Sequence, residues 1–313
     1  MASALADSFD HIFGAANGCL SISEQAAERF LERLRSGGYE RPSLYGRHFD
    51  LIDAIERDDL TAAQIQLDAV LNARPAAREI IVSGAGEPVF DGEAATLLPF
   101  FAAEEDAAFV FTAPSKEGSA SAVAESIEAL ALIEATVPGL ADELREIVRW
   151  TLLARGEVRP GHTPETNGFG GSSALRAWGA ILLNAGTLIS PIGRAFAILH
   201  EGTHDLIFAL SPKDGVVNNP DDERYPSPLR RDPRPLEGIY HATFVLARLD
   251  FAARAMVASG LLDGEQEAVA RRHLLNSHLF FDGLATLEKH ADLTPEGQDA
   301  MGQAEAYMRG HTA

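Results

Sequence analysis

Residues 190–210 read SPIGRAFAILHEGTHDLIFAL, and the interpretation of the second half of the chain starts from this stretch. Ser190 followed by Pro191 is typical of a helix start, because a serine hydroxyl caps free backbone N–H groups and proline fits the first helical position. Apolar residues dominate the rest of the stretch, and the next proline is Pro212. We therefore predict one long, largely buried helix that ends near Leu210.

The middle of this predicted helix carries the pattern His-Glu-Gly-Thr-His at residues 200–204. Positions i and i+4 lie ~40° apart around a helix, so His200 and His204 share one face and can bind a single metal ion. Glu201 lies beside that pair, where a zinc peptidase uses this glutamate to polarise a metal-bound water. The alternative is a pair of core histidines without a metal, which leaves Glu201 and Asp205 as costly charges in an apolar helix.

Two histidines from one helix do not complete a metal site, so a further ligand must come from another segment. A second helix is predicted from about Leu236, and it offers Glu237 and His241 four residues apart on one face. His241 lies in the apolar run GIYHATFVL, where a histidine needs a partner such as a metal or a backbone carbonyl. We expect His241 to be the third ligand, with Glu237 as the alternative. Histidines without such a context are interpreted as surface or loop residues: His11, His48, His162, His290 and His311.

Three arginines and one aspartate lie just before that second helix, in the segment LRRDPRP at residues 229–235. Arginine binds carboxylates through two parallel hydrogen bonds, and the prolines stiffen the segment that carries it. This pattern predicts a site for a small acid beside the metal. The alternative is that the arginines pair with nearby acids such as Asp221, Asp222 and Glu223.

The composition excludes several classes of partner and site. The chain has 313 residues, with 46 acidic and 26 basic side chains, so its formal charge is −20. Nucleic acids and anionic membranes bind basic surfaces, so we expect neither as a partner. The one cysteine, Cys19, excludes an internal disulfide and a cysteine-based zinc site. No basic signal segment and no apolar run of ~18 residues is present, so we expect a cytoplasmic protein and leave its oligomeric state open.

The remaining patterns indicate an α+β fold that is mainly α, with a small β-sheet next to the metal-binding helix. Residues 119–137 and 139–154 are interpreted as two helices, and residues 156–173 as a loop. The expected strands lie at residues 79–82, 108–112 and 175–189.

Two domains are expected from this order of elements. Residues 1–115 are interpreted as an N-terminal helical subdomain with short strands, and residues 116–313 as the metal-binding catalytic domain. The first of these is a candidate for binding a peptide, although its sequence identifies no site.

Three segments in order resemble a known family: SSALRAWGAILLN at residues 172–184, AILHEGTHDL at 197–206 and YPSPLRRDPRPLEGIYH at 225–241. They are similar to the HExxH-motif family of peptide-modification proteins, whose members are associated with ribosomally made peptide natural products and include 2-oxoglutarate-dependent peptide β-hydroxylases. The resemblance covers roughly residues 105–260, and the arginine segment followed by a helical histidine is more specific than HExxH alone. It implies that the metal ligands are His200, His204 and His241, and that the family's arginine–aspartate–arginine element is Arg230, Asp232 and Arg234.

The resemblance also implies an activity: an iron(II)- and 2-oxoglutarate-dependent oxygenase that hydroxylates the β-carbon of a residue in a precursor peptide. Three protein ligands on one face of the iron leave three positions for the co-substrates. The far carboxylate of 2-oxoglutarate then needs a cationic anchor, for which Arg230 and Arg234 are the candidates. Glu201 handles a proton near the metal in this interpretation.

Two other functions remain open from the residues. A zinc metallopeptidase would use Glu201 as the general base. A non-catalytic peptide-binding subunit would keep the metal for structure only, and its acidic surface would suit a basic peptide.

Overall fold

The computed structural model describes residues 1–16, 18–104, 108–161, 169–186, 190–212, 215–227 and 232–311. Helices account for 64% of the structure and the five strands of a small mixed sheet for 11%, so the expected α+β class that is mainly α is confirmed. The chain forms two compact units, each built from two segments. The first unit comprises Met1–Ser119 and Val148–Gly186, and the second comprises Ala120–Ile147 and Thr187–Ala313.

These two units differ from a simple division near residue 115. The chain leaves the first unit after Ser119, contributes a helical segment to the second, and returns to the first unit at Val148. The return is required because the strand that begins just after Val148 pairs with two strands of the first segment. The expected peptide-binding and catalytic domains are defined by function rather than by contacts, and they stay a prediction.

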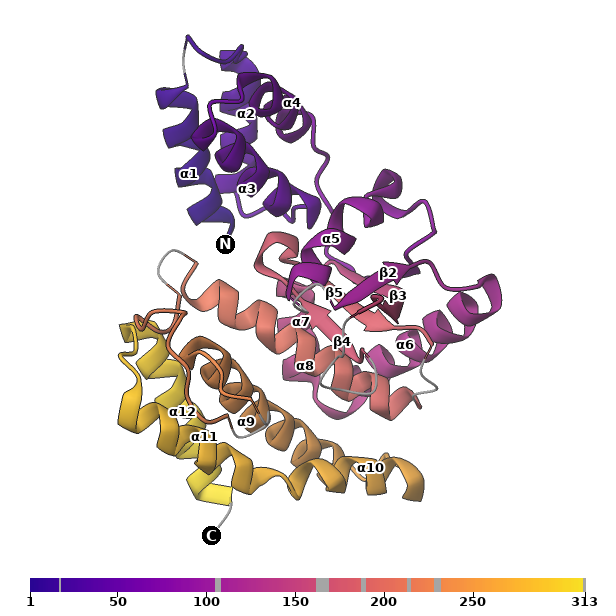
Figure 1. Ribbon diagram of the computed structural model, residues 1–313. Coiled ribbons are helices and arrows are strands. Elements are labelled where there is room, and N and C mark those ends of the chain that lie inside the picture. Colours follow the sequence, from indigo (N-terminus) through magenta and orange to yellow (C-terminus); the bar gives the residue numbers. More distant parts are fainter. Residues whose placement is uncertain are drawn as a thin grey trace. The chain divides into compact units, whose positions relative to one another are not determined.

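The first unit begins with four helices around a shared apolar core: α1 (Ala2–Ala15), α2 (Glu24–Arg35), α3 (Ser43–Glu56) and α4 (Leu60–Leu71) (Figure 1). Phe9 lies at the centre of this core, with its ring edge-on to Phe30 at a centroid distance of 4.9 Å. Aromatic residues bury large apolar areas, so they stabilise a bundle of such short helices.

A mixed sheet follows in the same unit, together with the helix α5 (Ala94–Glu104). Its strands are β1 (Ile81–Gly84), β2 (Phe109–Thr112), β3 (Trp150–Val158), β4 (Gly171–Ser173) and β5 (Ala180–Asn184). The strand order is β1-β3-β5-β4, and β2 pairs with another part of β3. β3 is central and pairs in parallel with both β1 and β5, with Trp150 opposite Ile81 and Ala180. The buried Trp150 donates its indole N–H to the Ser83 hydroxyl at 2.9 Å, which ties β3 to β1.

Two local expectations are corrected by this sheet. The helix expected at residues 139–154 is wrong in its last part, because α7 (Pro138–Ile147) ends early and β3 begins at Trp150. The loop expected from residue 156 is also wrong where it overlaps β3 and β4. A short apolar run fits a buried strand as well as a buried helix, and only the pairing of β3 with two neighbours decides between them.

Helices are the main elements in the described part of the second unit, and isolated β-bridges occur between them. Besides α7 it contains α6 (Lys116–Thr136, apart from its first turn), α8 (Pro191–Leu210), α9 (Leu236–Ala258), α10 (Gly264–Leu274), α11 (Ser277–His290) and α12 (Pro295–His311). The long helix α9 is central in this unit, because it packs against α8, α10, α11 and α12. Its buried Tyr240 donates a hydrogen bond to the Gly297 carbonyl at 2.9 Å and so fixes α9 to α12.

No helix within the described ranges combines the length and the apolar character needed to cross a membrane. The expected position of the sheet beside the HExxH helix stays a prediction, since the sheet and α8 belong to different units.

Candidate metal centre

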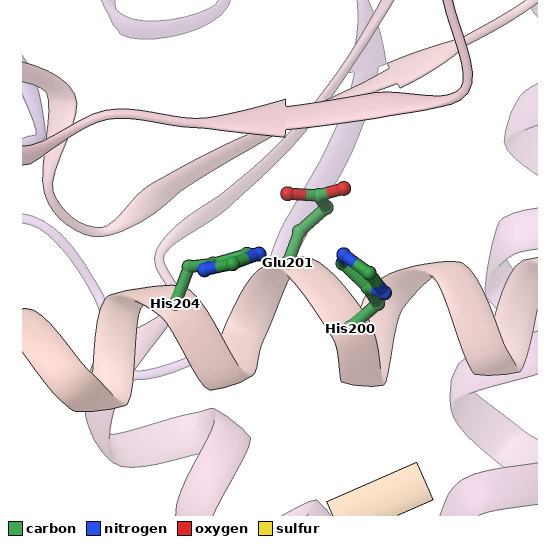
Figure 2. Close-up of side chains that lie close together, drawn as sticks. All are labelled: His200, Glu201 and His204. Atoms are coloured by element: carbon green, nitrogen blue, oxygen red, sulfur yellow. The ribbon is translucent and has the colours of Figure 1, made fainter. Parts of the chain in front are cut away.

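Helix α8 forms as the sequence predicts and carries the HExxH residues near its middle. The Ser190 hydroxyl accepts a hydrogen bond from the Gly193 N–H at 3.5 Å, and Pro191 is the first helical residue. His200, Glu201 and His204 project from the same side of α8 (Figure 2). One ligand atom from each of these three residues lies within 4.8 Å of those of the other two. This spacing fits groups arranged around one ion.

The surroundings of His204 favour its neutral imidazole. Glu201 is buried, and burial is also the main reason that the pKa of His204 lies well below the usual value of 6.5. The neighbouring His200 and His241 lower this pKa further, because like charges would repel. Metal ligation requires a neutral imidazole, so these surroundings prepare His204 for it.

His241 comes from α9 and meets α8 at His204. The two Nδ1 atoms lie 2.9 Å apart, and the rings stack at a centroid distance of 5.1 Å. Phe208, one turn after His204, packs against His241 at 5.3 Å. Two imidazole nitrogens on one ion, each ~2.1 Å from it and at right angles, would lie about 3 Å apart, as would two that share one proton. The contact thus fits a shared metal as well as a hydrogen bond.

His241 is nevertheless outside the group in which every ligand atom lies within 4.8 Å of every other. The structure therefore brings together His200, Glu201 and His204 as one group, and the contact between His204 and His241 joins His241 to it. The three-histidine ligand set stays a prediction, with the contact between His204 and His241 in its support.

Glu237 lies beside His241, as the four-residue spacing predicts. Its Oε1 atom is 3.4 Å from Nε2 of His241. That Nε2 atom is buried and makes no hydrogen bond within the described residues. A carboxylate next to the outer nitrogen of a ligand histidine orients the ring and raises its basicity. The geometry gives Glu237 this position with respect to His241.

The arginine element is described only in part. Arg230 lies outside the described residues, whereas Asp232 and Arg234 form an ion pair in which Oδ2 and Nε are 2.8 Å apart. The backbone of Arg234 exchanges two hydrogen bonds of 2.9 Å with Tyr225. These bonds hold Arg234 immediately before α9, the helix of His241. The acidic residue of this ion pair, Asp232, comes from within the element.

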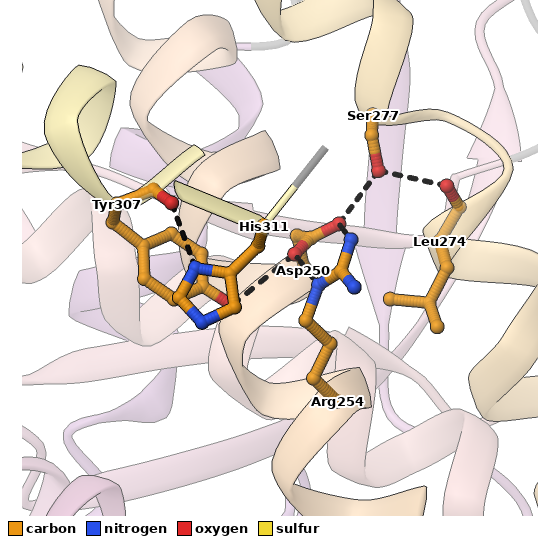
Figure 3. Close-up of polar contacts among 6 residues, drawn as sticks. All are labelled: Asp250, Arg254, Leu274, Ser277, Tyr307 and His311. Carbon is orange, nitrogen blue, oxygen red and sulfur yellow. Dashed lines mark hydrogen bonds and ion pairs between the residues drawn. The ribbon is translucent and has the colours of Figure 1, made fainter. Parts of the chain in front are cut away.

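Two buried charged residues on the helices that carry the histidines were not recognised in the sequence. Arg194, six residues before His200, is buried and pairs with Glu125 of α6 at 2.7 Å. Asp250 of α9 is also buried, and it accepts hydrogen bonds from Arg254, Ser277 and Tyr307 (Figure 3). The signal for Arg194 was an isolated arginine in the apolar run PIGRAFAIL. Such paired charges fix how α8 and α9 are held by their neighbours.

One histidine outside the centre was misinterpreted. His48, expected at the surface or in a loop, is buried on α3, with its Nε2 atom 2.8 Å from the Ser8 hydroxyl. Burial lowers the pKa of His48 to about 4. The apolar residues Leu44 and Leu51, four before and three after it, place it on the buried face of the helix. His162 lies outside the described residues.

No protein-family model matches this chain, and no curated protein matches it in sequence. The resemblance, which covers roughly residues 105–260, consequently depends on its three sequence segments alone and stays a prediction.

Proposed function

We propose that the protein is an iron(II)- and 2-oxoglutarate-dependent oxygenase that hydroxylates a β-carbon in a peptide. The observation that carries this proposal is the 2.9 Å contact between the Nδ1 atoms of His204 and His241. It adds a third imidazole, from a second helix, to the HExxH pair. In the sequence, His241 comes directly after the arginine element, which is the order of motifs in the peptide β-hydroxylases that the sequence resembles.

The donor set fits such a metal. Imidazole nitrogens bind iron(II) and zinc, and none of the residues in the group is a cysteine, which would favour a softer ion. The buried Nε2 atom of His241 makes no hydrogen bond within the described ranges, and Glu237 lies 3.4 Å from it. In the proposed enzyme His200, His204 and His241 bind the ion, and Glu237 orients His241.

Iron(II) bound at this position would supply the activation of dioxygen, which is the oxidant and gives one oxygen atom to the peptide and one to succinate as 2-oxoglutarate loses carbon dioxide. Glu201 is close enough to the two α8 histidines to hold a proton beside the ion. Phe208 against His241 excludes water from that side. Arg234 binds the far carboxylate of 2-oxoglutarate. This carboxylate either shares the guanidinium with Asp232 or takes the place of Asp232.

A zinc metallopeptidase is the second candidate, and one specific observation favours it. The Glu201 carboxylate belongs to the same 4.8 Å group as His200 and His204, which is where a general base for a metal-bound water is needed. His241 would then be the third zinc ligand, and the arginine element would have no defined role in the chemistry.

The products formed from a peptide separate these candidates. The protein is loaded with iron(II) without oxygen and then given 2-oxoglutarate, air and a panel of synthetic heptapeptides that each present a different central residue with a β-methylene group. We expect succinate together with a peptide that has gained one oxygen. The products should disappear in His204→Ala and persist in His278→Ala, a surface histidine of the same unit.

Shorter peptides without succinate, obtained with zinc, would instead establish the peptidase. Peptide binding with neither product would favour the non-catalytic subunit. For the co-substrate, Arg234→Ala should abolish 2-oxoglutarate binding while metal binding is retained, and Arg271→Ala on α10 is the matched control. Unchanged 2-oxoglutarate affinity in Arg234→Ala would contradict the assigned anchor.

A further inference from the structure

A pocket in the second unit lies outside the metal group. It has a volume of about 500 Å³ and is lined by residues of α7, α8, α9 and α12. Small-molecule sites commonly measure ~300–1,000 Å³. On α8 the pocket uses Leu206 and Leu210, which point ~200–240° away from His204 around the helix axis. The metal-binding face of α8 and its pocket-lining face are therefore different.

Three aromatic rings line this pocket: Phe244, Phe251 and Tyr307. Phe251 is 42% exposed, unusual for so large an apolar side chain, and its ring is edge-on to Tyr307 at a centroid distance of 5.6 Å. The Tyr307 hydroxyl donates to the buried Asp250 at 3.2 Å, and His311 stacks on the ring at 4.3 Å (Figure 3). The tyrosine ring is thus held in place without a ligand.

The charged groups around these rings are predominantly acidic. Glu296 and Asp299, on the first two turns of α12, are exposed and line the pocket. The one basic residue in the lining, Arg248, forms an ion pair with Glu143, which also lines it. Because these two charges cancel, Glu296 and Asp299 leave a local charge of about −2 beside the rings.

We propose that this pocket binds an organic cation carried on an apolar stem. Aromatic faces attract cations through their quadrupole, and nearby carboxylates add charge attraction. Leu206, Leu210 and Phe244 form the apolar wall for the stem. A free alkylamine and the lysine side chain of a peptide share this chemistry. The site is additional to the proposed oxidation, because none of its lining residues belongs to the metal group.

Ligand-observed NMR titrations of the metal-free protein test the proposal independently of any hydroxylase activity. The probes are n-hexylamine and its uncharged counterpart n-hexanol, and the peptides Ac-Ala-Lys-Ala-NH2 and Ac-Ala-Nle-Ala-NH2, where Nle is norleucine. We expect hexylamine to bind about tenfold more tightly than hexanol at low salt. Lysine-peptide binding identifies a peptide side chain as the ligand, whereas binding of hexylamine alone identifies a free amine.

Substitutions of the lining residues test whether hexylamine binds in this pocket. Glu296→Gln combined with Asp299→Asn should weaken hexylamine about fivefold. The matched control is Glu265→Gln combined with Asp282→Asn, which removes the same charge from exposed positions of α10 and α11. Phe251→Leu keeps an apolar side chain, so it should weaken hexylamine about threefold and leave hexanol unchanged. Equal binding of hexylamine and hexanol, or equal losses in the two double variants, would overturn the proposal.

Discussion

The two units of the molecule each contain a histidine whose pKa is lowered mainly by loss of water, and the two differ in their neighbours. His48 in the first unit has a pKa of about 4 and a hydroxyl partner, Ser8, at 2.8 Å. His204 in the second unit has a pKa well below its usual value and an imidazole partner, His241, at 2.9 Å.

This difference in neighbours distinguishes His48, a core histidine, from His204, a candidate metal ligand. A serine hydroxyl satisfies one nitrogen of a neutral ring, and the aromatic ring of Phe9 packs edge-on against His48 at 5.0 Å. His204 instead has two further histidines and a carboxylate nearby, and these are side chains that bind metal ions. A low pKa is therefore common to both histidines, and it is the set of neighbours that makes His204 the candidate ligand.

The largest effects are expected from removing His204 or His48, and the two variants should differ in their zinc affinity. His204→Ala should weaken zinc binding more than about 100-fold, because even an orienting partner of a ligand contributes 10–100-fold. His48→Ala should leave the zinc affinity unchanged and destabilise the first unit. Zinc affinity is measured by competition with a chromophoric chelator, with His278→Ala as the surface control. Equal affinities in His204→Ala and His278→Ala would contradict the metal centre.

Acidification should destabilise the first unit through His48. Its folded pKa of about 4 is below the unfolded value of 6.5, so the unfolded chain binds the extra proton between these pH values. The stabilisation from a neutral His48 is complete above pH ~6.5 and is lost as the pH falls toward ~4, by about 3 kcal/mol in total. Both tryptophans, Trp150 and Trp178, lie in this unit, so their fluorescence reports its unfolding in urea.

The control for this pH dependence is His48→Gln, which keeps a hydrogen-bonding side chain that does not titrate. The free energy of unfolding of the native chain should decrease more steeply between pH 6.5 and pH 4 than that of the variant. Parallel curves for the two proteins would show that His48 is not held neutral by burial.

The HExxH pair could be predicted from the sequence because its geometry is local. His200 and His204 belong to one helix, and the start of that helix is marked by Ser190 and Pro191. The contact between His204 and His241 is not local, since it depends on how α8 packs on α9. The apolar run around His241 nevertheless indicated that this histidine needs a partner.

Features that depend on distant partners were harder to predict. β3 was misread as the end of a helix because Trp150–Val158 acquires its character from β1 and β5, which are distant in sequence. The pairs of Arg194 with Glu125 and of Asp250 with Ser277 join residues from different helices. The spacing of Leu44, His48 and Leu51 did carry a local signal for a buried histidine, which the presence of adjacent charged residues obscured.

A smaller effect is expected from the residue next to His241. Glu237→Gln should weaken zinc binding about tenfold, because an amide orients the histidine ring less strongly than a carboxylate does. His241→Ala should weaken it more than Glu237→Ala, if His241 is the ligand and Glu237 its partner. The same chelator competition measures all three variants, and Glu265→Gln is the control for lost charge. A larger loss in Glu237→Ala than in His241→Ala would make Glu237 the ligand.

The smallest effect is expected at the hydroxyl partner of His48. Ser8→Ala leaves the Nε2 atom of His48 without this bond, so the free energy of unfolding should fall by about 1 kcal/mol while zinc affinity stays unchanged. Ser36→Ala removes an exposed hydroxyl that donates to the Arg33 carbonyl at 2.7 Å, and it should cost less because water replaces that bond. Tryptophan fluorescence in urea measures both variants. Equal losses would mean that water also reaches His48, and the distinction between a satisfied core histidine and a candidate ligand would then depend on the metal-binding results alone.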